Sequence, residues 1–341
     1  LSQAQRAVKA AQLAAQLEPG SRLTANQRAT LSEWTSLAQW IGTERGAAAV
    51  AAVEKVWPDY GPTASGSILN AYYTDVDVVD VVWQWLARHG VTEGHGFEPG
   101  CGRGIWMHAA PSGCTMDGVD IDPISVKIAR LLTGQHAEVA RIEEWNLARS
   151  LRPDLGGYDF VVGNVPFSSN RPGRNNPHRD NLHNMSVMRS VEMLRPGGVA
   201  AVITSRYALD AATSRDWRAR LAEQVDLVAA FRLPSGTHRA AGTAVVTDLL
   251  VLRRPLRDDR RPEPTWIDTT TFTIDGPDGD SATFTHNRHF DDHPTRVLGD
   301  YEAGGAWSPT NFSVRSAATA ADALGEVLER VTVDYRPQGS A

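Results

Sequence analysis

An amide, a turn-forming proline and an aromatic ring follow one another in the motif Asn164-Val165-Pro166-Phe167. The apolar run from Tyr158 to Gly163 precedes the motif and predicts a buried strand that ends there. The side-chain oxygen of Asn164 and the carbonyl of Val165 can accept both N–H bonds of an exocyclic amine, and Pro166 fixes the turn on which they converge. Phe167 offers a face for an unstacked base. The motif therefore predicts catalytic residues for methylation of an aromatic amine.

A glycine-rich loop is predicted about 60 residues upstream, where another strand ends. Its sequence is Phe97-Glu98-Pro99-Gly100-Cys101-Gly102-Arg103-Gly104. Each glycine removes a Cβ and permits positive φ, so the backbone can approach a nucleotide-like ligand closely. The next predicted strand ends in Gly118-Val119-Asp120-Ile121, which places the Asp120 carboxylate where it can accept hydrogen bonds from both ribose hydroxyls.

The glycine loop suits S-adenosylmethionine (SAM) better than a dinucleotide. The dinucleotide fingerprint G-x-G-x-x-G needs a third glycine where Ile105 stands. SAM carries no phosphate and is held by acids and backbone amides. Glu143 can face the adenine amino group or simply begin a solvated helix, and Thr74 can bond the methionine carboxylate or simply cap a helix. The predicted cofactor-binding residues are Thr74, Glu98, Pro99, Gly100, Gly102, Gly104, Asp120, Ile121, Glu143 and Asn164.

Strand and helix patterns alternate through the middle of the 341-residue chain, which predicts an α/β fold with a mostly parallel sheet. The strands are expected near residues 94–98, 115–120, 137–142, 158–162, 198–203, 225–233 and 244–252. Ligands then bind at the carboxyl ends of the strands. A hydrophobic content of 42% is enough to bury one such domain.

Two attachments flank the predicted catalytic domain, which spans residues 67–256. Residues 1–66 are expected to form a helical extension that caps or braces it, because Thr24-Ala25-Asn26-Gln27 is a capping-box pattern followed by apolar residues at helical spacing. Residues 257–341 are expected to form a small appendage of short strands that ends in a helix near 317–333. The chain begins with Leu, which suggests a segment of a longer polypeptide.

The net charge of −6 argues against indiscriminate coating of nucleic acid, although a local basic patch is compatible with it. Arginines cluster at 171–179, 215–220 and 253–261, as phosphate contacts or as solvated surface charges. The loop from Ser168 to Asn184 follows the catalytic motif directly and is expected to touch phosphates beside a flipped base.

No run of 18 apolar residues is present, so we expect a cytoplasmic protein with no membrane partner. The two cysteines, Cys101 and Cys114, are expected to be reduced and structural. The segment from His286 to His293 has a metal-like composition but no matching partner at a known spacing. No metal site is therefore predicted.

Together, these motifs resemble those of N6-adenine DNA methyltransferases, and more particularly the methylase part of the large helicase-methylase fusions of phages and mobile elements, including DarB-type antirestriction proteins. The similarity covers roughly residues 20–300. The segments that carry it are Thr24 to Trp34, Asn70 to Thr74, Phe97 to Gly104, Asp120, Asn164 to Phe167, Leu194 to Val199, Ile203 to Arg206, Phe231 to Pro234, Ala241 to Thr243, and Thr247-Asp248.

The resemblance implies a Rossmann-like seven-stranded SAM-dependent methyltransferase fold with Asn164 catalytic and Phe167 stacking on the base. It also implies DNA as partner, a helicase region in the same parent polypeptide, and a role in restriction-modification or antirestriction. Val165 stands where most adenine methylases have proline, Arg103 and Ile105 are bulkier than usual, and residues 265–341 are short for a target-recognition domain.

Two other functions are compatible with the motifs. Related enzymes with an N-P-P-Y motif methylate protein glutamine or RNA guanine, but phenylalanine at position 167 disfavours them. Alternatively, the chain is a SAM- or DNA-binding module whose catalysis has lapsed. Its best support is the bulky glycine loop and the missing recognition domain.

Overall fold

The structure is a computed structural model that describes residues 2–37, 43–58, 60, 74–168, 170–237, 245–275, 281–305 and 308–337. The segments Asn70 to Tyr73 and Ala241 to Thr243, which contribute to the resemblance, lie outside these residues, as does the expected boundary between residues 66 and 67. Within the described ranges, no helix has both the length and the apolar composition needed to cross a bilayer.

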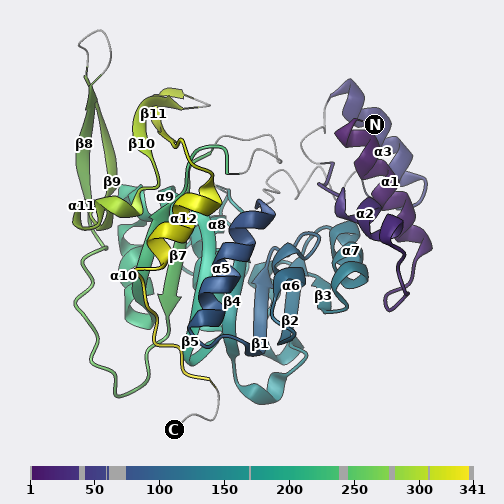
Figure 1. Cartoon of the computed structure of the whole chain (residues 1–341), viewed down its shortest axis with the longest axis horizontal. Helices are drawn as coiled ribbons and strands as arrows, with labels where there is room; N and C mark the ends of the chain where they lie inside the picture. The colour runs from purple at the N-terminus through teal and green to yellow at the C-terminus, as the bar shows by residue number, and fades with distance from the viewer. Residues whose placement is uncertain are drawn as a thin grey trace.

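Seven strands form one twisted central sheet in the order β3-β2-β1-β4-β5-β7-β6 (Figure 1). β7 runs antiparallel to β5 and β6, and the other pairings are parallel. The predicted α/β, Rossmann-like seven-stranded fold is confirmed. The strands are β1 (Glu93–Pro99), β2 (Gly113–Asp120), β3 (His136–Val139), β4 (Tyr158–Asn164), β5 (Leu194–Ser205), β6 (Asp226–Arg232) and β7 (Thr247–Arg253).

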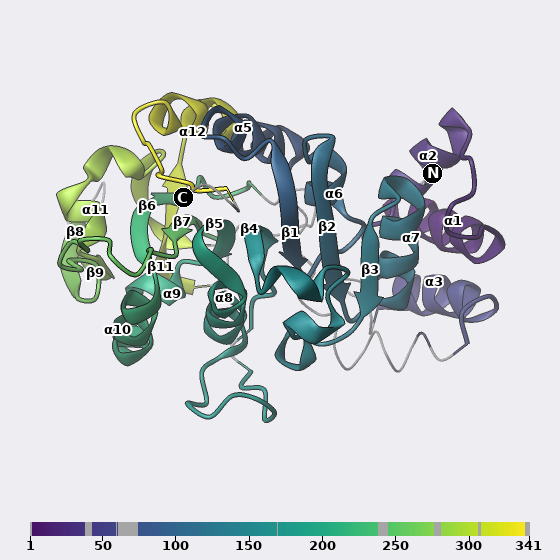
Figure 2. The same cartoon turned by 90° about the horizontal axis from the view of Figure 1, so that it is seen from below.

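Helices cover both faces of the sheet, with α5, α6 and α12 on one face and α8 and α10 on the other (Figure 2). α5 is helical although it is rich in valine, because its apolar residues recur at helical spacing and are buried against the sheet. Its Trp83 packs edge-on against Phe160 of β4. The helices are α5 (Val76–Arg88), α6 (Ile105–Ala109), α7 (Pro123–Thr133), α8 (Leu182–Glu192), α9 (Tyr207–Asp210), α10 (Arg215–Gln224) and α12 (Ala320–Leu328).

Three N-terminal helices pack on the outer side of α7, beside β3: α1 (Gln3–Gln16), α2 (Ala25–Ser32) and α3 (Glu44–Glu54). The expected capping box is confirmed, since Thr24 caps α2 and exchanges hydrogen bonds with Gln27. The alanines that α1 buries form a second hydrophobic core with Trp34 and with Ile124 and Ile128 of α7. The N-terminal helices thus share a core with an element of the main sheet.

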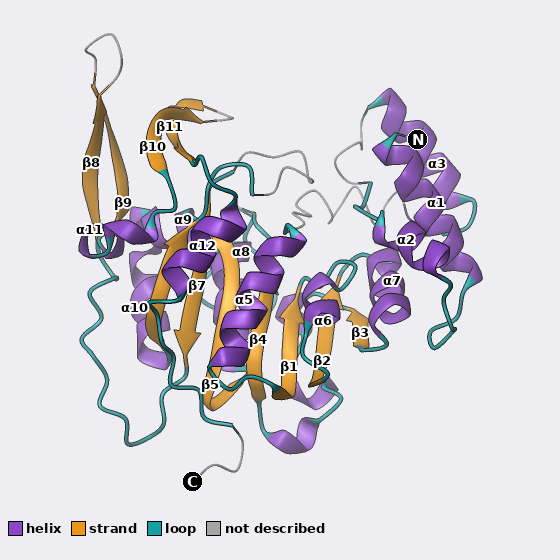
Figure 3. Cartoon of the chain, viewed as in Figure 1, coloured by secondary structure: helices purple, strands orange, loops and turns teal. Residues whose placement is uncertain are grey.

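Two β-hairpins attach at the end of the sheet opposite the N-terminal helices (Figure 3), near β6, which is labelled in Figure 2. They are β8 (Thr269–Asp275) with β9 (Ser281–Asn287), and β10 (Asp300–Gly305) with β11 (Ser308–Arg315); α11 (His289–Asp292) follows β9. Arg232 of β6 is fully buried and pairs with Asp248 at 2.9 Å and with Asp210 at 2.7 Å. A bridge between Arg232 and Val297, with a 3.0 Å bond from Leu298 N to Arg232 O, covers the end of the free edge of β6.

The terminal helix is shorter than expected and packs on the main domain. α12 lies against α5, and the indole of Trp85 in α5 donates to the carbonyl of Val331 at 2.9 Å. In the segment with metal-like composition, His286 pairs with Asp291 and His289 accepts from the backbone of Ala230. The described residues contain no group of three or more side chains placed to hold a metal ion.

We predict opposite effects for alanine at two glycines. A Cβ on Gly96 of β1 would lie 1.9 Å from the ring of Phe160, so Gly96→Ala should lower the free energy of unfolding by roughly 3 kcal/mol. Gly325 lies inside α12 with its nearest neighbour 3.9 Å away, so Gly325→Ala should raise it by about 0.5–1 kcal/mol. Urea denaturation measures both. Equal stability of the two variants would contradict the packing described for β1.

Candidate active site

A cavity of about 720 Å³ opens at the carboxyl ends of β1, β2 and β4. It brings together most of the site residues predicted from the sequence: Thr74, Glu98, Gly100, Gly102, Asp120, Ile121, Glu143, Asn164, Val165 and Pro166. Pro99, Gly104 and Phe167 are not among the described residues that line it. The two motifs, far apart in sequence, therefore share one pocket.

The glycine loop has the backbone conformation that its sequence predicts. Gly100, Gly102 and Gly104 have φ values of 67°, 51° and 78°, in the left-handed region that favours glycine. Gly104 begins α6 and packs on α7, because a Cβ there would lie 3.1 Å from that of Ala129. The bulky side chain of Arg103 is not among the described residues that line the cavity. It donates to the carbonyl of Trp34 at 2.7 Å.

Three buried or half-buried acids line the cofactor side of the cavity. Asp120 accepts from the backbone N–H of Gly102 at 2.8 Å and of Asp122 at 2.9 Å, and Glu98 accepts from that of Met107 at 3.0 Å. Burial raises the pKa of Glu98 well above its ordinary value and also raises the pKa of Asp120. Burial, and then the charge of Asp120, raise the pKa of Asp122 to about 7. An anionic ligand group such as pyrophosphate is disfavoured among these acids.

The motif at the end of β4 lies directly against the glycine loop. A Cβ on Gly100 would be 3.3 Å from the ring of Pro166 and 3.6 Å from the carbonyl of Asn164. The Val165 N–H donates to Ile203 of β5 at 3.0 Å, which holds the turn to the sheet. Phe167 is 7% exposed and packs in the main core. Its ring therefore does not face the cavity in this structure.

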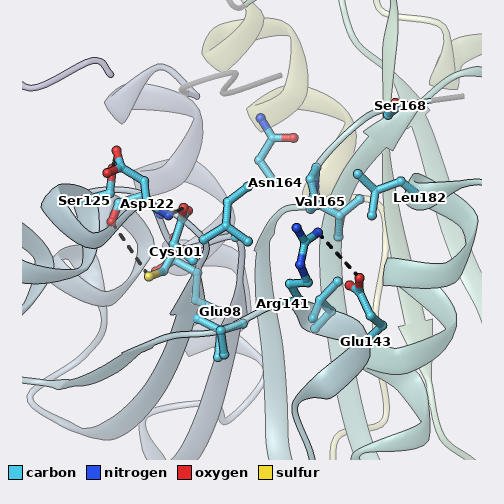
Figure 4. Close-up of a pocket in the computed structure, with 18 of the residues that line it drawn as sticks. Glu98, Cys101, Asp122, Ser125, Arg141, Glu143, Asn164, Val165, Ser168 and Leu182 are labelled. Atoms are coloured by element: carbon cyan, nitrogen blue, oxygen red, sulfur yellow. Dashed lines mark hydrogen bonds and ion pairs between the residues drawn. The ribbon is translucent and has the colours of Figure 1, made fainter. Parts of the chain in front are cut away.

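The opposite wall is a short 3₁₀ helix, Ile142–Glu144, and the loop that follows the catalytic motif. Glu143 is buried and lies 3.9 Å from Arg141, with which it is paired in Figure 4. The loop reaches this wall through Asn175, whose side chain donates to the carbonyl of Glu143 at 2.7 Å, and through Arg174, which pairs with Glu144 at 3.5 Å. Glu143, which the sequence places just after the third strand, thus lies in the wall of the pocket.

Thr74 is 4% exposed, and its hydroxyl has no hydrogen-bond partner within the described part of the chain. The residue that caps α5 is Asp75, so the alternative role of Thr74 as a helix cap is wrong. A buried hydroxyl that lines a cavity without a partner favours a polar ligand group there.

Two lining residues on the N-terminal side of α7 were missed from the sequence, Asp122 and Ser125. Asp122 caps α7, accepting from Ile124 N at 2.9 Å, and its second oxygen accepts from the Ser125 hydroxyl at 2.7 Å. Figure 4 shows both on the side of the cavity that faces away from Arg141 and Glu143. The sequence signal was the Asp-Pro pair at the helix start, typical of an N-cap.

The arginine clusters have different roles. Arg218 is fully buried and donates to backbone carbonyls, Arg253 is 7% exposed, and Arg220 forms a bidentate pair with Asp180. Arg171 and Arg174 are exposed at the rim of the cavity. Only the first cluster therefore has side chains at the mouth of the pocket.

The raised pKa of Asp122 predicts a pH-dependent stability. Between its ordinary value near 3.8 and its folded value of about 7, the folded state holds a proton that the unfolded state has lost, so the free energy of unfolding falls as pH rises through this window. Asp122→Asn stays neutral and keeps an oxygen for Ile124 N–H. Its free energy of unfolding, relative to that of the natural chain, should rise by roughly 2–4 kcal/mol between pH 4 and pH 8. Urea denaturation measures this difference. A constant difference across that range would contradict the raised pKa.

Comparison with known sequences finds partial similarity to a phage protein. The chain is 29% identical over 199 residues to Defense against restriction protein B of Escherichia phage P1. The match covers 57% of this chain and 9% of the phage protein, so the chain spans a small part of that relative. No family model matches the chain.

Two solved structures with a similar arrangement of elements are described as methyltransferases. A type I restriction-modification methyltransferase subunit from Streptococcus thermophilus is 16% identical, with a TM-score of 0.47, over 63% of this chain and 55% of its own. A class I SAM-dependent methyltransferase described from Listeria monocytogenes is 13% identical, with a TM-score of 0.49, over 75% and 82%.

Proposed function

We propose that this chain transfers a methyl group from SAM to the N6 amine of adenine in DNA. The observation that carries the proposal is the shared cavity, in which the glycine loop and Asp120 face the Asn164-Val165-Pro166 turn. The sequence similarity to an antirestriction protein supports a target in DNA. By the same analogy, the chain would belong to a larger phage, plasmid or defence-related protein with a helicase region.

The residues of the cavity fit SAM. Its volume lies within the usual range of small-molecule pockets, about 300–1,000 Å³. Asp120 would accept the ribose hydroxyls, since a carboxylate has about four acceptor sites and can accept them beside its bonds from Gly102 and Asp122. Thr74 would bond the methionine carboxylate, and Glu143 the adenine amino group. The surrounding acids suit a cationic sulfonium better than a pyrophosphate.

The target amine would be held by Asn164 and Val165. SAM supplies a methyl group on a sulfonium, which becomes the thioether S-adenosylhomocysteine when the amine nitrogen attacks. The two oxygen acceptors would draw the amine N–H bonds out of the plane of the base and so localise the nitrogen lone pair. Amide and carbonyl oxygens do not take up a proton at neutral pH, so the proton lost by the methylated nitrogen passes to solvent.

An adenine in duplex DNA would have to leave the stack to reach this turn. Arg171 and Arg174, exposed at the rim, would contact the phosphates beside it. Stacking of the base on Phe167 stays a prediction, and it requires the buried ring to become accessible when DNA binds. With few such contacts, DNA binding by this chain would be weak.

Cofactor binding provides the first test. Asp120→Ala should weaken SAM binding by about 1.5–3 kcal/mol, because it removes hydrogen bonds to a charged acceptor. Asp154 is an exposed acid that pairs with Arg152 two residues away and does not line the cavity, so Asp154→Ala is the control and should leave affinity unchanged. Calorimetry measures both. Unchanged affinity in the Asp120 variant would remove this residue from the site.

Methyl transfer provides the second test. Asn164→Ala should abolish transfer and leave SAM affinity nearly intact, since the amide acts on the amine and not on the cofactor. Asn146→Ala, which removes only the exposed cap of a 3₁₀ helix, should keep full activity. Labelled SAM is incubated with DNA, RNA and protein, and the labelled polymer is identified. Label on RNA or protein alone would reject the DNA target, and normal turnover by Asn164→Ala would reject the mechanism.

A further inference from the structure

A single tryptophan joins the N-terminal helices to the elements that form the cofactor side of the cavity. Trp34 follows α2 and is fully buried. Its indole N–H donates to the Ser125 hydroxyl at 2.8 Å, and that hydroxyl donates to Asp122 at 2.7 Å. All three side chains are at most 2% exposed, so this chain of hydrogen bonds is shielded from water and therefore strong.

Trp34 also contacts the glycine loop. Arg103 donates to the Trp34 carbonyl at 2.7 Å. Trp34 thus contacts the glycine loop through its carbonyl and the start of α7 through its indole. Asp120 connects these two elements, because it accepts from the backbone of both Gly102 and Asp122.

The N-terminal segment also contributes directly to the cavity wall. Ser36, two residues after Trp34, lines the cavity and is 1% exposed. Its φ of 62° lies in the left-handed region, which costs a residue with a side chain roughly 1–2 kcal/mol. A strained, buried residue at a cavity is held there by its surroundings, so the conformation of Ser36 depends on how this N-terminal segment packs.

We propose that Trp34 is a positioning residue for the cofactor, through which docking of the N-terminal helices and cofactor binding are coupled. This inference rests on the proposed function. Trp34 does not line the cavity. It acts through Ser125 and Asp122, which do, and through Arg103 on the glycine loop. Because coupling is reciprocal, the bound cofactor must also stabilise the docked helices.

Trp34→Phe tests the coupling, since phenylalanine retains an aromatic ring and loses the N–H donor. The control is Trp57→Phe, because the Trp57 indole donates to the Ala11 carbonyl at 2.9 Å among the same helices, away from the cavity. By calorimetry, Trp34→Phe should raise the Kd for S-adenosylhomocysteine about fivefold. Trp57→Phe should leave it within about twofold. Equal Kd values for both variants would overturn the inference.

Hydrogen exchange of the natural chain gives a second measurement that needs no variant to fold. S-adenosylhomocysteine should slow amide exchange in α1 and α2, and this protection should shrink in Trp34→Phe. No protection in the natural chain at saturating ligand overturns the inference and leaves the proposed function intact. Absence of any binding by the natural chain would instead reject the proposed function.

Discussion

The close approach of β1 and β4 is the constraint on which the site depends. Gly96 leaves room for the ring of Phe160 between the strands, and Gly100 leaves room for Pro166 where the strands end. A Cβ at Gly96 would overlap the ring of Phe160, and one at Gly100 would crowd Pro166 at 3.3 Å on a backbone with a φ of 67°. The glycine loop follows β1 and the Asn164-Val165-Pro166 turn follows β4, so the pairing of these two strands places the two motifs side by side.

Electrostatics add a second constraint. Glu98, Asp120 and Asp122 lie close together in a buried site, and each accepts at least one backbone N–H. These bonds only partly offset the cost of burial, as the raised pKa values of all three carboxyl groups show. A ligand that donates hydrogen bonds, or that carries positive charge, relieves this cost. The site therefore favours a ligand of that kind.

The sequence predicted the parts of the molecule that follow from local patterns. The strands, the capping box at Thr24 and the joint cavity of the two motifs followed from apolar runs, cap residues and the rule that ligands bind at strand ends. Long-range side-chain contacts were not predictable, because no local pattern encodes them. The bond from Trp34 to Ser125, the packing of α12 on α5 and the burial of Phe167 and Arg218 all depend on segments brought together only by the tertiary fold.

The two edges of the central sheet bear on whether another chain can pair with it. An exposed strand edge is a template on which another chain can add a strand. At the last residue of β6, the bridge from Arg232 to Val297 occupies that position, and Arg232 is held by ion pairs with Asp210 and Asp248. The opposite edge strand, β3, has only four residues. Strand addition by another chain is therefore restricted at both described edges of the sheet, by a backbone contact at one and by the short length of the strand at the other.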